Sequence, residues 1–216
     1  MIPTPSRDTA LSIPVNTLGR LSLYRRLLRE QLAAGARQVY SHQLALLAVG
    51  TPAQVRRDLM TIGFAGSPRR GYVIADLVDR INVVLARSVE TAVALVGVGN
   101  LGRAILAYYA NRQPVRFVAA FDRAPEKTGR ILHGCRCYPV EQMAEVIQRE
   151  AIHVGVIAVP AAEAQAVADQ LVLSGVKGIL NFAPVRLRVP AGLYVENVDL
   201  MMALDRVAYY AHELHS

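Results

Sequence analysis

The stretch Thr91-Ala-Val-Ala-Leu-Val-Gly97-Val-Gly-Asn-Leu-Gly102 decides the fold, because an apolar run leads directly into a glycine-rich turn. The run 91–96 predicts a buried strand, and residues 101–109 have the spacing of a helix. About twenty residues beyond Gly102, a second apolar run ends in Asp122. A strand, a G-x-G-x-x-G turn, a helix and a downstream carboxylate together predict a Rossmann fold that binds a dinucleotide.

Each glycine of the turn has its own role in this prediction. Gly97 permits a tight turn, Gly99 lets the backbone approach a pyrophosphate, and Gly102 lets the helix pack closely on the strand. The helix N-terminus offers its N–H groups to the phosphates. Asp122 would accept hydrogen bonds from an adenosine ribose, which favours NAD over NADP. Arg123 would weaken that preference if it faced the ribose, but its side chain is expected to face elsewhere. The cofactor-binding residues predicted from this layout are Gly97, Val98, Gly99, Asn100, Leu101, Gly102, Asp122, Arg123, Val159 and Pro160.

The alternation of elements continues beyond Asp122. Helices are predicted at 140–149 and 161–173, and strands at 154–158, 178–181 and 193–196. Such alternation is typical of an α/β fold with a parallel sheet. The ligands of such a sheet lie at the carboxyl ends of the strands, which explains the choice of Val159 and Pro160.

The sequence offers poor catalytic candidates. The Ser/Tyr/Lys set of a short-chain dehydrogenase is missing, and no second domain is large enough to hold a substrate. Cys135 and Cys137 could form a redox pair or half of a metal site, but the sequence has no other cysteine. Both are therefore interpreted as structural, and no metal site is predicted. We therefore predict that the chain is not an enzyme and that the dinucleotide is sensed rather than used.

The charge of the chain is concentrated in its first part. Residues 1–90 hold 12 arginines, no lysine and 6 acidic residues, a net charge of +6, whereas residues 91–216 hold 12 basic and 11 acidic residues, a net charge of +1. A basic module beside a near-neutral one indicates a polyanionic partner for the first, although a basic surface can also serve solubility alone.

Targeting signals are not apparent in the sequence. No apolar stretch reaches the roughly 18–20 residues that span a bilayer, and residues 1–16 lack the apolar core of a secretory signal. These sixteen residues are interpreted as a flexible tail. Two cysteines give no disulfide framework, so a cytoplasmic location is expected.

Three helices are predicted in the arginine-rich part, at 17–34, at 41–49 with Ser41 as its N-cap, and at 52–60. The third begins with Thr51 as N-cap and Pro52 at the first helical position, and Gln54 would complete a capping box. Val55 and Leu59, which are four positions apart, are predicted to point inward. The opposite face of this helix carries Ala53, Arg56, Arg57 and Met60. A capped helix with exposed arginines after a tight turn is typical of a helix-turn-helix.

The segment 62–72 predicts a wing after this helix. Three glycines favour a hairpin, and Arg69 and Arg70 would lie at its tip, where cations can enter a minor groove. A connecting helix is predicted at 74–85. An ordinary three-helix bundle with a solvated arginine face is the alternative interpretation. The predicted DNA-binding residues are Ser41, Gln43, Ala53, Gln54, Arg56, Arg57, Arg69 and Arg70.

The last segment, 198–214, has helical spacing with apolar side chains on one side. Such a helix must cover either its own sheet or a partner subunit, and winged-helix proteins usually dimerise to span two half-sites. The predicted organisation is a tail at 1–16, a winged-helix domain at 17–88, a Rossmann domain at 89–197 and a terminal helix at 198–216.

Several segments across the chain resemble the Rex family of redox-sensing transcriptional repressors. They are Arg20-Leu-x-x-Tyr24-x-Arg26-x-Leu28, Gln43-Leu-Ala45, Gln54-Val-Arg-Arg-Asp-Leu59, Val96-Gly-Val-Gly-Asn-Leu-Gly-Arg-Ala104, Ala119-Ala-Phe-Asp122, Gly178-Ile-Leu-Asn-Phe-Ala-Pro184 and Glu196-Asn-Val-Asp-Leu200. The wing departs from the family's usual glycine-rich tip, because this chain has Gly66-Ser-Pro-Arg-Arg-Gly-Tyr72.

The resemblance implies a homodimer with a winged-helix domain, a Rossmann-fold NAD(H)-binding domain and a domain-swapped C-terminal helix. NAD⁺ and NADH would compete for one site, and NADH would close the dimer and release an inverted-repeat operator. Arg56 and Arg57 would read the major groove. The residues that the resemblance assigns to the nicotinamide and to coupling between the domains are Arg26, Tyr108, Asp199 and Leu200.

Two other functions stay open at this point. One is a small NAD-dependent oxidoreductase whose basic N-terminal part is an oligomerisation arm, which would be recognised by turnover of a substrate. The other is a regulator that senses CoA or another nucleotide, against which Asp122 argues because CoA carries a phosphate on its ribose.

Overall fold

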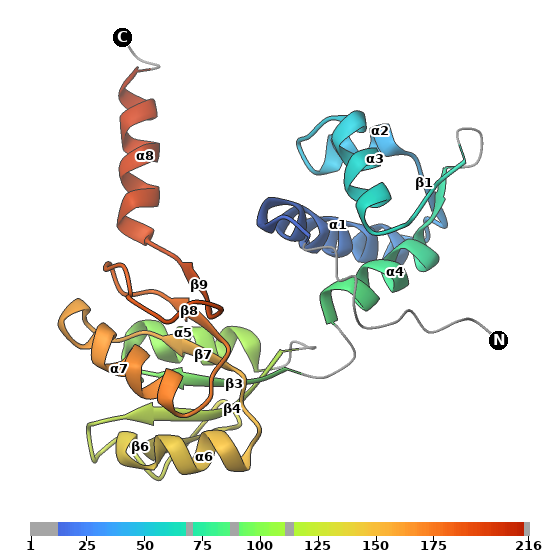
Figure 1. Ribbon diagram of the computed structural model, residues 1–216. Coiled ribbons are helices and arrows are strands. Elements are labelled where there is room, and N and C mark those ends of the chain that lie inside the picture. The colour runs from blue at the N-terminus through green and yellow to red at the C-terminus, as the bar shows by residue number, and fades with distance from the viewer. Residues whose placement is uncertain (1–12, 68–70, 87–90, 111–114, 214–216) are drawn as a thin grey trace. The chain divides into compact units, whose positions relative to one another are not determined.

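The computed structural model describes residues 13–67, 71–86, 91–110 and 115–213, and the chain divides into two compact units, Met1–Val89 and Glu90–Ser216 (Figure 1). The elements of the first unit are α1 (Val15–Ala33), β1 (Gln38–Val39), α2 (Ser41–Leu47), α3 (Pro52–Thr61), β2 (Tyr72–Val73) and α4 (Ile74–Ala86). Among the described residues, no helix is both long enough and apolar enough to cross a membrane.

The first helix begins earlier than the sequence predicted. The carbonyl oxygen of Pro14 accepts hydrogen bonds from the backbone N–H groups of Thr17 at 2.8 Å and Leu18 at 3.0 Å. Because proline fixes a φ close to the observed −56°, the chain enters α1 at Val15, inside the predicted tail. Residues 1–12 of that tail lie outside the described residues.

The helix predicted from Ser41 starts there, but Ser41 is not its N-cap. That position belongs to Tyr40, whose backbone is extended and whose N–H group donates to Gln43 Oε1 at 2.8 Å. The cap of α3 is confirmed, since Thr51 Oγ1 accepts from the Gln54 N–H group at 3.2 Å. Ser41 therefore stands inside α2 with its hydroxyl available to another side chain.

One apolar core holds the first unit together. Its fully enclosed side chains come from all four helices and include Leu21, Leu28, Leu44, Val55, Leu59, Ile74, Leu77 and Ile81. The two-residue strands β1 and β2 pair antiparallel, a contact that the sequence did not predict. Ser67 and Gly71 form a bridge at the base of the predicted wing, whereas its tip, with Arg69 and Arg70, lies outside the described residues.

The second unit is a doubly wound α/β domain. Its elements are β3 (Thr91–Val96), α5 (Asn100–Tyr109), β4 (Val115–Asp122), β5 (Ile131–Leu132), β6 (Cys135–Pro139), a 3₁₀ turn (Val140–Gln142), α6 (Met143–Arg149), β7 (Val154–Ile157), α7 (Ala161–Leu173), β8 (Gly178–Asn181), β9 (Tyr194–Asn197) and α8 (Leu200–Glu213). The strands form one sheet in the order β5-β6-β4-β3-β7-β8-β9, parallel except for β5 (Figure 1). The predicted α/β class is confirmed.

Alternate residues of β3 enter two separate cores, one on each face of the sheet. Ala94 and Val96 pack with α6 and α7, whereas Val93 and Leu95 pack with α5. The sheet is therefore covered on both faces, as its near-continuous apolar strands require. The order of the strands reverses at β3, so a crevice is expected at its carboxyl end, between β4 and β7.

The strands β5 and β6 were not predicted, because β6 alternates polar and sulfur-containing residues rather than branched apolar ones. Cys135 and Cys137 lie on its buried side, and both thiols are free. Burial raises the pKa of the Cys135 thiol to about 12. Both cysteines thus serve the core under α5, in agreement with their structural interpretation.

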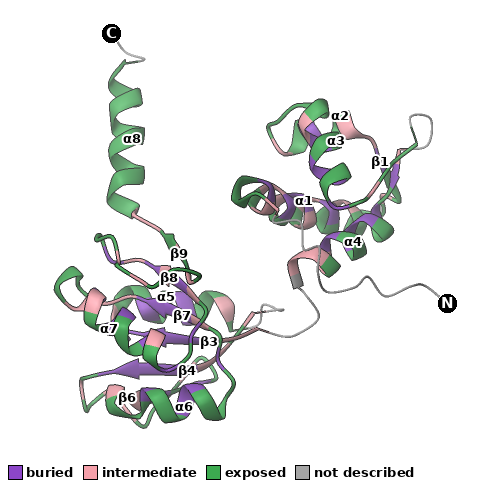
Figure 2. Ribbon diagram, viewed as in Figure 1, coloured by how far each residue is buried: buried purple, intermediate pink, exposed green. Residues whose placement is uncertain are grey.

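The terminal helix α8 contributes to no core. None of its residues is buried, and Figure 2 shows the helix exposed along its whole length. It begins two residues later than predicted, because Asp199 caps it by accepting the Met202 N–H group at 2.9 Å. Its large exposed side chains are Leu200, Met201, Met202, Leu204, Val207, Tyr209 and Tyr210.

Candidate functional site

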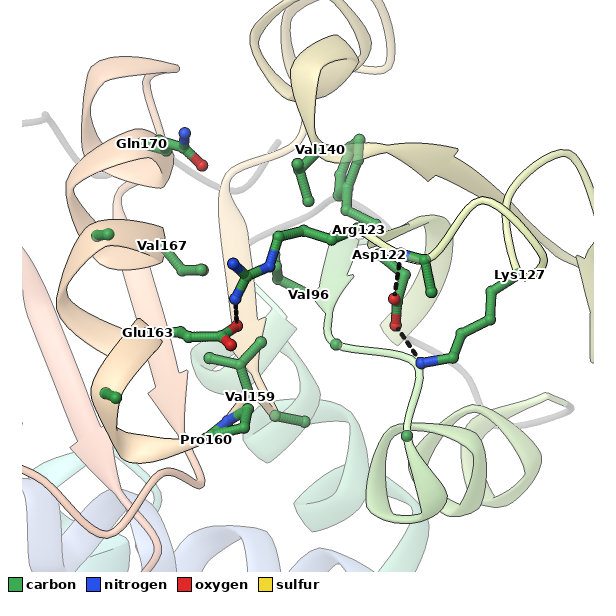
Figure 3. Close-up of a pocket in the computed structure, with 17 residues that line it drawn as sticks. Val96, Asp122, Arg123, Lys127, Val140, Val159, Pro160, Glu163, Val167 and Gln170 are labelled. Carbon is green, nitrogen blue, oxygen red and sulfur yellow. Dashed lines mark hydrogen bonds and ion pairs between the residues drawn. The ribbon is translucent and has the colours of Figure 1, made fainter.

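A pocket of about 750 Å³ lies at the carboxyl ends of β3, β4 and β7 in the second unit (Figure 3). The glycine turn and the end of β4 form one side, and the first turns of α7 form the other. The residues that line it are Val96, Gly97, Gly99, Phe121, Asp122, Arg123, Ala124, Lys127, Val140, Ala158, Val159, Pro160, Ala162, Glu163, Ala166, Val167 and Gln170. This is the position expected for a ligand of an open α/β sheet.

The glycine turn has the geometry of a phosphate cradle. Gly97 has a φ of +97°, and a Cβ there would lie 2.5 Å from the Ala158 carbonyl oxygen. A Cβ on Gly102 would collide with the Gly97 carbonyl oxygen, so α5 can approach the turn only without a side chain there. A Cβ on Gly99 would meet nothing within 4 Å, which leaves open space beside the first turn of α5.

Asp122 at the end of β4 is held by three donors. Its Oδ1 accepts from the Ala124 N–H group at 2.9 Å, and its Oδ2 accepts from the Val98 N–H group at 2.7 Å and from Lys127 Nζ at 3.0 Å. Burial by itself would raise the pKa of this carboxyl, but these hydrogen bonds and the lysine charge lower the pKa below its ordinary value. The carboxylate is therefore ionised and fixed in orientation at the edge of the pocket.

The two neighbouring cations point in different directions. Arg123 forms an ion pair with Glu163 in the first turn of α7, whereas Lys127 turns back to Asp122 (Figure 3). Lys127 and Glu163 were not predicted from the sequence. The lysine lies five positions beyond Asp122, so a search for cations on the loop after that strand would have found it.

The structure brings together six of the predicted cofactor-binding residues as pocket lining: Gly97, Gly99, Asp122, Arg123, Val159 and Pro160. Val98 and Gly102 are buried beneath the turn, and Val98 reaches the site through its N–H group. Asn100 and Leu101 form the exposed first turn of α5, where the Asn100 side chain accepts from Arg103.

Tyr108, Asp199 and Leu200 do not line this pocket within a single chain. Tyr108 is exposed near the end of α5 and packs edge-to-face with Tyr109 at 5.0 Å between ring centroids. Asp199 caps α8, and Leu200 is exposed on the same helix. These three side chains are placed by α5 and α8, not by the glycine turn.

In the first unit, α3 presents the predicted DNA-binding face. Ala53, Arg56 and Arg57 are exposed, while Val55 and Leu59 are fully buried on the other side, as predicted. Arg56 Nη1 donates to Ser41 Oγ at 3.2 Å, which joins the start of α2 to α3. Guanidinium groups on a rigid, capped helix can reach phosphates and base edges of a duplex.

The two predicted glutamines on this face have contacts within the protein. Gln43 binds the Tyr40 backbone, as described above. The amide oxygen of Gln54, in the orientation that satisfies both groups, accepts from Arg20 Nη1 at 3.2 Å. The capping box predicted for α3 is therefore only half right. The Gln54 N–H group does donate to Thr51, but the Gln54 side chain binds Arg20 of α1 instead of the Thr51 N–H group.

A buried charge fixes α3 to α1. The Asp58 carboxylate accepts from Arg20 Nε at 2.6 Å and Nη2 at 2.7 Å, and from the Tyr24 hydroxyl at 3.0 Å. Burial, and then the bond to Asp58, raises the pKa of Tyr24 to about 12. The Arg20–Asp58 pair orients the exposed face of α3. Arg26, the predicted coupling residue, lies exposed farther along α1 in the same groove as Arg25 and Arg29.

Comparisons with known proteins match both units of the chain. Residues 12–59 match the family model described as "Putative DNA-binding protein N-terminus", and residues 88–185 match the model described as "CoA binding domain". The repressor Rex of Syntrophobacter fumaroxidans, a redox-sensing transcriptional repressor, is 42% identical over 201 residues, which are 92% of this chain and 95% of that protein.

Solved structures lead to the same group of proteins. The Rex-family repressor RSP in complex with NAD⁺ and operator DNA is 30% identical, with a TM-score of 0.87 and 94% of each chain covered. RSP in complex with NADH has a TM-score of 0.83, with 94% of this chain and 96% of that chain covered. The relatives are named as repressors and not as enzymes, in agreement with the prediction from the missing catalytic residues. The chain belongs to the Rex family of redox-sensing transcriptional repressors.

Proposed function

We propose that this protein is a homodimeric repressor that binds inverted-repeat operator DNA and releases it when NADH occupies the second unit. The observation that carries the proposal is the presence, in one chain, of a dinucleotide pocket edged by the Asp122 carboxylate and a capped helix that exposes Arg56 and Arg57. Because the relatives are named as repressors, we propose that binding itself is the output.

The pocket fits a dinucleotide by its geometry. The open space at Gly99 and the N-terminus of α5 suit a pyrophosphate, because backbone N–H groups and the helix dipole favour its charge. Asp122 suits an unphosphorylated ribose. The same carboxylate argues against CoA, whose ribose carries a phosphate, although one matching family model is named for that ligand. We propose Gly97 to Gly102, Asp122, Arg123, Val159 and Pro160 as the residues that hold the dinucleotide.

The DNA contacts are proposed for Ser41, Gln43, Ala53, Gln54, Arg56, Arg57, Arg69 and Arg70. Arg56 and Arg57 would enter the major groove, and Arg69 and Arg70 would follow the minor groove. Two copies of α3 are needed to read an inverted repeat, which supports a dimer. The exposed apolar side chains of α8 support its exchange between the two protomers. We propose the domain limits 17–88, 89–197 and 198–216, and a cytoplasmic location, where the operator DNA lies.

A ligand shifts a two-state equilibrium only through different affinities for the two states. NAD⁺ and NADH differ by one charge and by the planarity of the nicotinamide ring. We propose that Asp199 and Tyr108 respond to that difference, with Leu200 beside the ring, and that Arg26 carries the response to the first unit. Because Asp199 also caps α8, its charge and its capping oxygen must be tested separately.

The test is fluorescence anisotropy of a labelled inverted-repeat duplex, titrated with protein at fixed salt, alone and with NAD⁺, NADH or CoA. We expect binding alone and with NAD⁺, and release by NADH at micromolar concentration. Asp199→Asn keeps an oxygen that can cap α8 but removes the charge, so it should bind DNA and lose its response to NADH. A protein that binds no duplex in any state, or is released by CoA instead, would contradict the proposal.

A further inference from the structure

The dinucleotide pocket is electrically balanced. Its lining includes four charged side chains, which form two ion pairs: Asp122 with Lys127 and Arg123 with Glu163 (Figure 3). The first pair lies at the end of β4, where a carboxylate that binds the adenosine ribose is expected. The second joins the residue after β4 to the first turn of α7. A ligand therefore meets no net charge from these four groups.

A carboxylate at the end of this strand discriminates against a phosphorylated ribose by repulsion between two negative charges. In this protein that charge is compensated at close range, because Lys127 Nζ lies 3.0 Å from Asp122 Oδ2. Lys127 is about one-third exposed and lines the pocket, so it can face a group that lies beside Asp122. The fixed orientation of Asp122 by two backbone N–H groups keeps this arrangement in place.

Arg123 is the other cation near this carboxylate, and its side chain was expected to face away from the ribose. Its guanidinium forms an ion pair with Glu163 and points away from Asp122 (Figure 3). Lys127 is thus the cation closest to the carboxylate, and the only one of the two that bonds to it among the residues the structure describes.

We infer that Lys127 is a specificity-determining residue, which reduces the discrimination of the pocket against a ribose 2′-phosphate that Asp122 alone would impose. This inference rests on the proposed binding of NAD(H) at this site. Asp122 gives the pocket its preference for NADH over NADPH, and Lys127 sets how strong that preference is.

The test compares the dissociation constants of NADPH and NADH, measured by quenching of intrinsic tyrosine fluorescence or by calorimetry at fixed ionic strength. Lys127→Met should raise the ratio of the two constants about fivefold, a size typical of one partly exposed charge interaction. Lys127→Arg should keep the ratio close to that of the unaltered protein. The matched control is Lys177→Met, because Lys177 is the other lysine of the chain, directly precedes β8 and does not line the pocket.

The outcomes separate this inference from the proposed function. If the unaltered protein binds no NADH, the proposed function itself is wrong. If NADH binds but the ratio stays within twofold of its original value in Lys127→Met, or falls, then Lys127 does not set the specificity. An equal rise in Lys177→Met would show a general charge effect and would also overturn the inference.

Discussion

Each unit of this protein contains a buried carboxylate with several donors, and the two differ in what surrounds them. Asp58 is enclosed between two helices, and its partners are the side chains of Arg20, Tyr24 and, at 3.5 Å, Thr17 on α1. Asp122 is bound by two backbone N–H groups and one lysine, and it lines a cavity. The comparison teaches that burial of a charge does not by itself mark a binding site. The space in front of the charge separates a structural group from one that can meet a ligand.

The largest expected effect is on stability, in the first unit. Asp58→Ala should lower the free energy of unfolding by about 2–4 kcal/mol, because it leaves Arg20 and the Tyr24 hydroxyl without their buried acceptor. Asp122→Ala should cost only about 1 kcal/mol, since its donors border a cavity that water can fill, yet it should abolish tight NADH binding.

Urea unfolding of the whole chain measures both changes. Asp79→Ala, which removes an exposed carboxylate of α4, is the control and should leave the midpoint of unfolding unchanged. An equal or greater loss of stability in Asp122→Ala would contradict the comparison, because the cavity-lining carboxylate would then be the structural one.

A smaller effect is expected from Tyr24→Phe, which removes one donor from Asp58 and keeps the arginine. The free energy of unfolding should fall by about 1 kcal/mol, the usual size of one hydrogen bond in a protein. NADH affinity should stay within twofold, since Tyr24 lies in the other unit. A loss as large as that of Asp58→Ala would mean that the hydroxyl, and not the arginine, is the main partner of the carboxylate.

The smallest expected effect is a loss of folding stability at extremes of pH. The first unit should lose stability at alkaline pH, and the second unit should lose it at acid pH. The raised pKa of Tyr24 stabilises the first unit fully below about pH 10, and this contribution is lost as pH rises towards about 12. The lowered pKa of Asp122 stabilises the second unit above its ordinary value of 3.8, and this contribution is lost as pH falls through the lower folded value. Unfolding midpoints across pH, with Tyr24→Phe as reference, should show no alkaline loss of this origin in the variant.

Much of the fold could be predicted from local patterns. The glycine turn, the helices α3 and α7 and the strands β3 and β8 follow from spacing and capping signals that act within a few residues. The paired strands β1 and β2 could not be predicted, because two residues carry no periodicity. Their existence depends on partners more than thirty positions away.

The sequence predicted where the site residues lie on the backbone, but it did not predict which side chains they contact. The sequence placed Asp122 correctly at the pocket, but its lysine partner follows from the course of the loop after β4. Asp58 stands beside two exposed arginines, so its sequence neighbours suggest a solvated residue. Its burial depends on Arg20, which lies 38 positions earlier on another helix.

The exposed helix α8 has a consequence for how this protein can change over evolutionary time. Every core residue within the described part of the chain precedes Asp199, so substitutions in α8 leave both interiors intact. Selection would then act on this helix only through the molecule it meets, and not through folding. Related chains in one cell could diverge there to avoid mixed assemblies while keeping the same cofactor and the same interior packing.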